Sequence, residues 1–222
     1  RDLHYPLSRQ RQMCIRERYG FGFKKDLKRK SEANTLHFLP ELNSDDLKRL
    51  FGALFQKKIW SYGNSCDVIF FMISENLKAI ALDLSTSFPR SPRAVFAGYV
   101  IAGRMLDKCR AVINGSNHDY HFDCFLDNQF LGFAEIDADE IKGFISTGAT
   151  DDEVAEWIRS KARPRSKFEI IQWNNRMREL KMSELPEVNQ VFLESYVPKN
   201  LPDHRPVYVW FDVYDLEENR LS

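Results

Sequence analysis

The stretch DADEIKGFISTGATDDEVAEWIRSKARPRSKFEIIQWNNRMREL, residues 137–180, decides the fold class of this chain. It holds three pairs in which a helix-capping side chain precedes a glutamate by three residues: Asp137 with Glu140, Thr150 with Glu153, and Ser166 with Glu169. In such a capping box the first side chain accepts a hydrogen bond from a helix N–H, and the glutamate reaches back to the cap. Apolar residues at helical spacing follow each pair, so the stretch predicts three consecutive helices.

Further helices are expected on both sides of this stretch. An apolar stripe runs from Val100 to Ile113, and charged residues lie mostly on the other side: Arg104, Asp107, Lys108 and Arg110. This pattern predicts an amphipathic helix of about 15 residues that ends at Asn114-Gly115. Another helix is expected from about residue 186 to 196, whereas residues 207–214 alternate like a strand and are too few to assign. We therefore predict an all-α domain of five or six helices over residues 72–222.

Residues 1–71 differ from the rest in charge. They carry 14 Lys and Arg against 8 Asp and Glu, while the whole chain carries 32 of each. The segment has little apolar periodicity except for one amphipathic helix predicted near residues 45–58, which Ser44 can cap. We expect a basic and partly disordered N-terminal extension, because a charge asymmetry between two parts of a chain indicates a segment of different role or origin.

The composition of the whole chain narrows the functional classes. A net charge of zero argues against a surface built for nucleic acid. The four cysteines form no CxxC pair, which indicates reduced thiols in the cytoplasm. The longest apolar run, residues 68–73, is much shorter than the ~20 residues that span a bilayer, so no membrane anchor is expected.

A series of ordered motifs follows from about Asp83 to the end of the chain. The motifs are DLS (83–85), PRSPR (89–93), GYVI (98–101), RMLDKCRA (104–111), YHFDCFLD (120–127), GATDDE (148–153), PRS (164–166), WN (173–174) and FDVYDL (211–216). Over about residues 83–222 the chain resembles a bacterial family known as domain of unknown function 5069. The resemblance implies a single compact helical domain, and it implies no activity, cofactor or partner, because none is established for the family. Phe125 departs from the family pattern, in which a proline follows the cysteine.

The position of the resemblance also bears on the N-terminus. Members of the family begin shortly before the motif at Asp83, and Met72 starts a stretch typical of such a beginning. We therefore hypothesise that residues 1–71 are an upstream in-frame extension and that the native domain starts at Met72.

The densest set of chemically active side chains lies between His118 and Asp127. Histidine, aspartate and cysteine are ligand types for divalent metals, but in an extended loop His118 and His121 would lie on opposite faces, so we expect no metal. Cys124 is the candidate nucleophile or redox thiol, with His121 as its base and Asp123 and Asp127 beside it. Because carboxylates disfavour a thiolate, a buried structural cysteine is the preferred interpretation.

Two basic groups are candidates for anion binding. Arg163, Arg165 and Lys167 alternate along a proline-containing linker before a predicted helix N-terminus, where a phosphate could bind. Arg90 and Arg93 flank Ser91-Pro92 and could form a second anion clamp, although pairing with carboxylates such as Asp83 and Asp107 is the preferred interpretation.

No pattern in the chain defines a complete catalytic site. The preferred functional interpretation is a small binding or protein-interaction module whose partner is an unknown protein or small ligand, not a nucleic acid. The alternative is a thiol- or metal-dependent enzyme or ligand sensor centred on the loop from His121 to Cys124. The sequence identifies no cofactor.

Overall fold

The computed structural model describes residues 75–201 and 206–221. Within these ranges a short helix over residues 75–80 precedes seven longer α-helices and one 3₁₀ helix. The elements are α5 (Ala102–Asn114), α6 (Phe125–Ala134), α7 (Ala138–Ile145), α8 (Asp151–Lys161), α9 (Lys167–Glu179), η3 (Met182–Glu184), α10 (Glu187–Asn200) and α11 (Trp210–Glu217). The described residues contain no strand, so the all-α prediction is confirmed, with more helices than expected. The helix predicted near residues 45–58 lies outside the described residues.

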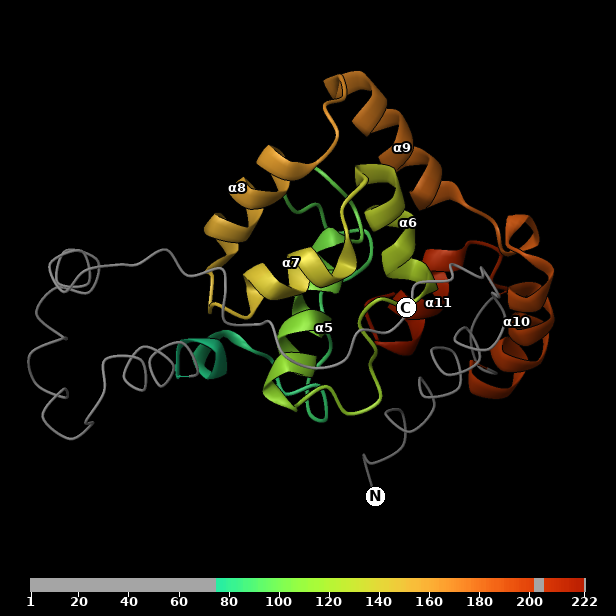
Figure 1. The fold of residues 1–222 in the computed structure, drawn as a ribbon. Helices are drawn as coiled ribbons and strands as arrows, with labels where there is room; N and C mark the ends of the chain where they lie inside the picture. The colour runs from blue at the N-terminus through green and yellow to red at the C-terminus, as the bar shows by residue number, and fades with distance from the viewer. Residues whose placement is uncertain (1–74, 202–205, 222) are drawn as a thin grey trace, which may run out of the picture. The chain divides into compact units, whose positions relative to one another are not determined.

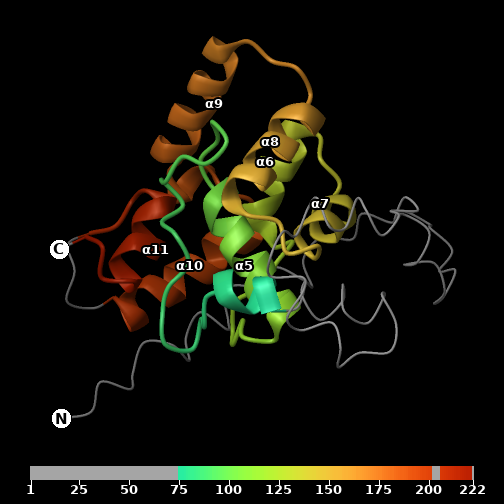
Figure 2. The same ribbon diagram turned by 90° about the vertical axis from the view of Figure 1, so that its left-hand side faces the viewer.

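Helix α5 lies among the other described helices, with α7 on one side and α11 on the other in both views (Figure 1, Figure 2). It contacts α6 and α7, and every residue from Ala102 to Ala111 is buried. The prediction of an amphipathic helix is therefore wrong in one respect, because the charged side of α5 faces other parts of the protein. The helix ends as predicted, at Gly115, whose φ of 73° suits a residue without a Cβ.

The capped helices α7, α8 and α9 form where the sequence predicts them. Thr150 and Ser166 each form a complete capping box with the glutamate three residues later. Asp137 accepts hydrogen bonds from the backbone N–H groups of Asp139 and Glu140, but no return bond from Glu140 completes a box. Hydrogen bonds from the backbone N–H and hydroxyl of Thr150 lower the pKa of Glu153, because they stabilise its charged form.

Two helices, α6 and α11, lie where no helix was assigned. Neither begins with a side-chain cap, and α6 follows directly from the loop that ends at Cys124. The segment before α11 is extended and forms an isolated antiparallel bridge between Lys181 and Val209. The strand-like alternation of residues 207–214 therefore corresponds to a short extended segment followed by a helix.

The apolar core draws on all the longer helices. Trp210 and Phe211 at the start of α11 are fully buried, and the ring of Trp210 lies 5.4 Å from that of Phe125. On the other side of the core Trp173 of α9 stacks on Phe133 of α6, with ring centroids 4.6 Å apart. Through these contacts α6 connects the early helices with the C-terminal ones.

Candidate functional site

The loop between α5 and α6 carries the side chains expected to support chemistry. His118 lies 2.6 Å from Asp119, and Asp123 accepts a hydrogen bond from the side chain of Asn128. Partial burial raises the pKa of Asp123. Within residues 75–201 and 206–221, no three His, Cys, Asp or Glu side chains converge to hold a metal ion.

Cys124 ends this loop as the N-cap residue of α6, and it contacts a charged residue that the sequence did not single out as a site residue. The Nζ atom of Lys108, on α5, lies 3.1 Å from the Sγ atom of Cys124. The same Nζ atom lies 2.8 Å from a carboxylate oxygen of Asp127, and both charged side chains are almost fully buried. The cysteine is thus buried, and it contacts a cation whose charge Asp127 balances.

Arg90 lies in an ionic cluster and does not face an open clamp. Its guanidinium donates hydrogen bonds to both carboxylate oxygens of Asp107, and it also pairs with Asp151. Arg110 donates to the same Asp151 carboxylate. Burial alone would raise the pKa of Asp151, but the hydrogen bond from Arg110 and the charge of Arg90 hold it below its usual value.

Arg93 is paired in the same way, with α11 as its partner. Its two terminal nitrogens lie 2.6 Å from carboxylate oxygens of Asp212 and Asp215. Asp83, which the sequence offered as a partner for these arginines, instead accepts hydrogen bonds from the backbone and hydroxyl of Ser85. The elbow at residues 89–93 therefore connects α5 to α11 through ion pairs.

The second basic group lies against the end of α6. Arg163 pairs with Glu135, and Arg165 stacks on the ring of Phe133 while donating to its carbonyl oxygen. Lys167 is exposed as the first residue of α9. Two of these three side chains thus fix the linker to α6.

A second ion pair, as deeply buried as that of Lys108 and Asp127, joins α5 to the residue after α11. Arg104 donates two hydrogen bonds to the carboxylate of Glu218, and the two side chains are 2% and 0% exposed. Glu218 also accepts a hydrogen bond from the hydroxyl of Tyr120 and contacts Arg220. Sequence spacing could not reveal this pair, because its members are separated by more than half of the chain.

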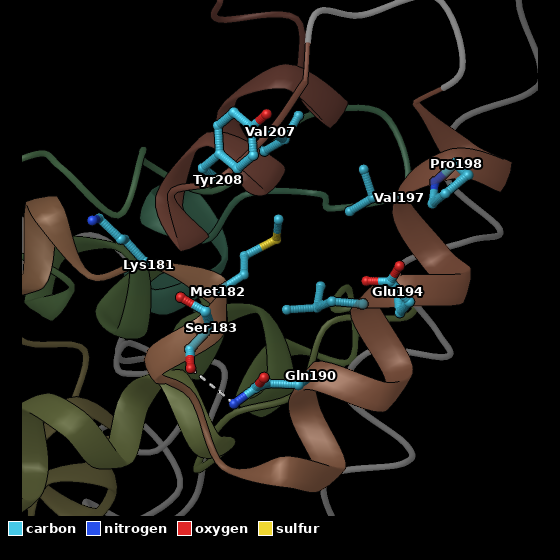
Figure 3. Close-up of a pocket in the computed structure, with 10 residues that line it drawn as sticks. Lys181, Met182, Ser183, Gln190, Glu194, Val197, Pro198, Val207 and Tyr208 are labelled. Carbon is cyan, nitrogen blue, oxygen red and sulfur yellow. Dashed lines mark hydrogen bonds between the residues drawn. The ribbon is translucent and has the colours of Figure 1, made fainter.

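One cavity formed by described residues lies between η3, α10 and residues 207–208 (Figure 3). We call it the α10 groove. It has a volume of about 560 Å³ and is lined mainly by apolar side chains. The lining residues are Lys181, Met182, Ser183, Gln190, Leu193, Glu194, Val197, Pro198, Val207 and Tyr208. None of the candidate site residues lies in this groove. No local sequence pattern indicates the groove, because it combines three separate segments.

The fold and these contacts define a class of all-helical domain in which paired charges surround the central helix and an apolar groove opens beside α10. Residues 86–220 match the family described as domain of unknown function (DUF5069), so the chain belongs to this family. A comparison with curated proteins found no match. Among residues 75–201 and 206–221, none of the helices has both the length and the apolar character needed to cross a membrane.

Proposed function

We propose that this chain is a protein-interaction module whose α10 groove binds a short apolar segment of a partner protein. The observation that carries the proposal is the exposed apolar surface in and around the groove. Its volume of about 560 Å³ falls within the range of binding sites that hold ligand groups, and its lining mixes apolar side chains with a few polar ones.

Helix α10 contains a proline among the residues that line the groove. Pro198 is part of α10 and has no N–H group, so it cannot supply the helical hydrogen bond to the carbonyl of Glu194 four residues earlier. Both residues line the groove. The break in the helical hydrogen-bond ladder therefore falls in the part of α10 that lines the groove.

The charged side chains of the groove determine which segments fit. In the close-up Lys181 and Glu194 lie on opposite sides of the groove, with Met182 between them (Figure 3). A segment with an apolar centre, an acidic residue at the Lys181 side and a basic residue at the Glu194 side is complementary to this arrangement.

The apolar surface extends beyond the groove, which favours a protein segment over a small ligand. Tyr208 is 70% exposed at the groove, and Val191 of α10 is 62% exposed one turn before Glu194. A small molecule in the cavity would leave Val191 in water, whereas a longer segment can cover both. Apolar surface that extends in this way is typical of protein–protein contact sites.

The remaining candidate residues give less support to an enzyme or an anion-binding protein. Arg90, Arg93 and Arg163 are engaged by carboxylates of the domain itself. We also place the protein in the bacterial cytoplasm, on the basis of the resemblance to a bacterial family and of Cys109 and Cys124, which form no disulfide bond.

Selection from a library of random peptides displayed on phage tests this function, with the full chain as bait. We expect selected peptides to share at least two apolar residues flanked by opposite charges. The Tyr208→Glu variant should weaken the binding of a selected peptide, measured by fluorescence polarisation, by about tenfold or more.

Phe168→Glu is the matched control, because Phe168 of α9 is 65% exposed and lies outside the groove. This variant should bind the peptide as the wild-type chain does. Peptides that bind both variants equally, or no selected peptides at all, would contradict the proposal. Self-association that Tyr208→Glu abolishes would replace the partner protein with a second copy of this chain.

A further inference from the structure

We propose that Cys124 and Lys108 form an oxidation site, at which hydrogen peroxide joins the two side chains through a reversible sulfur–nitrogen bond. This inference is independent of the α10 groove. It rests on the contact between a cysteine and a buried lysine that come from different helices.

The two reacting atoms are already adjacent. The Nζ atom of Lys108 lies 3.1 Å from the Sγ atom of Cys124, which is van der Waals contact distance or less. Lys108 is held by the middle of α5 and Cys124 by the N-cap position of α6. Because both side chains are buried on packed helices, the amine stays beside the sulfur atom throughout an oxidation.

Two features of the surroundings favour the thiolate form of Cys124, which is the form that reacts with peroxide. The ammonium group of Lys108 can donate a hydrogen bond to the sulfur atom, and the N-terminal end of α6 carries a partial positive charge. Of the two carboxylates that the sequence placed beside this thiol, Asp123 and Asp127, the charge of Asp127 is balanced by Lys108.

Cys109 provides a comparison within the same domain. It is the residue after Lys108 on α5, it is fully buried in the apolar core, and burial raises the pKa of its thiol to about 12. At neutral pH Cys109 is therefore a protonated and unreactive thiol, whereas Cys124 is 9% exposed and contacts a cation.

The reaction balances with hydrogen peroxide as the only co-reactant. The Cys124 thiolate attacks one peroxide oxygen, so that an S–O bond forms, the O–O bond breaks and hydroxide leaves; sulfur is oxidised by two electrons to a sulfenic acid. Asp127 takes a proton from the Lys108 ammonium, whose nitrogen then attacks the sulfur and displaces the hydroxyl group. Asp127 gives its proton to the displaced hydroxyl group, and the hydroxide from the first step takes a second proton from the nitrogen. The sum converts one thiolate, one ammonium and one peroxide into an S–N bond and two waters.

The bond has a structural consequence, because it removes the cation that pairs with Asp127. The Asp127 side chain is 0% exposed, and a buried carboxylate without a counter-ion is unfavourable. Oxidation should therefore loosen the first turn of α6 while it links α6 covalently to α5. Reduction by a thiol restores the ion pair, which makes the site a reversible redox switch.

Peptide mapping of the peroxide-treated full chain tests the proposal. After alkylation under denaturing conditions and digestion with trypsin, residues 105–110 should appear joined to residues 111–142, with a mass lower by two hydrogen atoms than the sum of the free peptides. Cleavage after Lys108 should be lost, and Cys109 in the joined product should carry the alkyl group. Dithiothreitol should separate the two peptides.

The Cys109 label distinguishes the proposed bond from a disulfide without any variant. A joined product in which Cys109 is not alkylated is a Cys109–Cys124 disulfide and overturns the proposal. So does a Cys124 that stays unmodified, or one that stops at sulfenic or sulfinic acid. The Lys108→Arg variant should give no joined product and at least about tenfold more labelling of Cys124 by dimedone, a reagent for sulfenic acids.

Discussion

Helices α5 and α10 place charged and apolar side chains in opposite environments. On α5 the charged residues Arg104 and Lys108 are each 2% exposed, and both pair with buried carboxylates. On α10 the apolar residues Val188 and Val191 are 46% and 62% exposed. The interior around α5 is thus more polar than its sequence pattern suggests, and part of the surface around α10 is more apolar.

The partners of the α5 charges explain the first half of this difference. Arg104 pairs with Glu218, and Asp107 pairs with Arg90 of the elbow before α5. A buried charge tolerates only a complementary partner in one geometry, so these pairs specify which segments pack on α5. The valines of α10 are exposed instead, and they present apolar surface. The paired charges of α5 thus bear on how the domain folds, and the exposed valines of α10 belong to the surface for which we propose a role in recognition.

The largest effect should come from breaking the pair between Arg104 and Glu218. Glu218→Gln keeps the size of the side chain and leaves the buried guanidinium without a counter-charge, so we expect the free energy of unfolding to fall by about 3–5 kcal/mol. Urea denaturation followed by circular dichroism measures it. Glu156→Gln is the control, because Glu156 pairs with Arg159 at the surface and should contribute about 0–1 kcal/mol. If both variants lost the same free energy of unfolding, the buried pair on α5 would contribute no more to stability than a surface pair, which would contradict this prediction.

A smaller effect should come from the close packing around α5. A Cβ at Gly103 would lie 3.2 Å from the Nε atom of Arg90 and 3.3 Å from the Cβ atom of Phe96. Gly103→Ala should therefore shift the arginine from Asp107 and lower the free energy of unfolding by about 1–3 kcal/mol. Gly132→Ala in α6 meets no atom within 4 Å and should raise the same quantity by about 0.5–1 kcal/mol. Urea denaturation should therefore give changes in the free energy of unfolding of opposite sign for the two variants. A stabilising Gly103→Ala would contradict the close packing around α5.

The same comparison shows how much the sequence could reveal. Helices α8 and α9, which Thr150 and Ser166 cap, were predictable because the cap and its partner glutamate lie within one turn and apolar residues at helical spacing follow. Helix α6 was not, because its N-cap Cys124 makes no side-chain cap bond and its residues FLDNQFLGFA are apolar on more than one side. Spacing showed that the α5 charges share one side of a helix, but it could not show that other segments cover that side.

For the candidate site, too, the sequence could reveal local patterns but not contacts between distant segments. His121, Asp123, Cys124 and Asp127 were identifiable as reactive residue types close together in the sequence. The contact that changes the interpretation of Cys124 comes from Lys108, 16 positions earlier and on another helix. Such non-local contacts have no sequence signal in a single chain, and the same is true of the three segments that form the α10 groove.

The smallest effect on stability, and a clear effect on recognition, should come from reversing a charge at the groove. Glu194 lines the groove on α10, so Glu194→Lys should change the free energy of unfolding by no more than about 0.5 kcal/mol. The same variant should bind a selected peptide with a basic flank a few fold more weakly, and it should bind a peptide with an acidic flank more tightly. Fluorescence polarisation measures both affinities. Replacement of Glu194 would then leave the free energy of unfolding nearly unchanged, whereas replacement of Glu218 would lower it. Unchanged preference for the basic flank would leave the charge pattern of the groove without a role in partner choice.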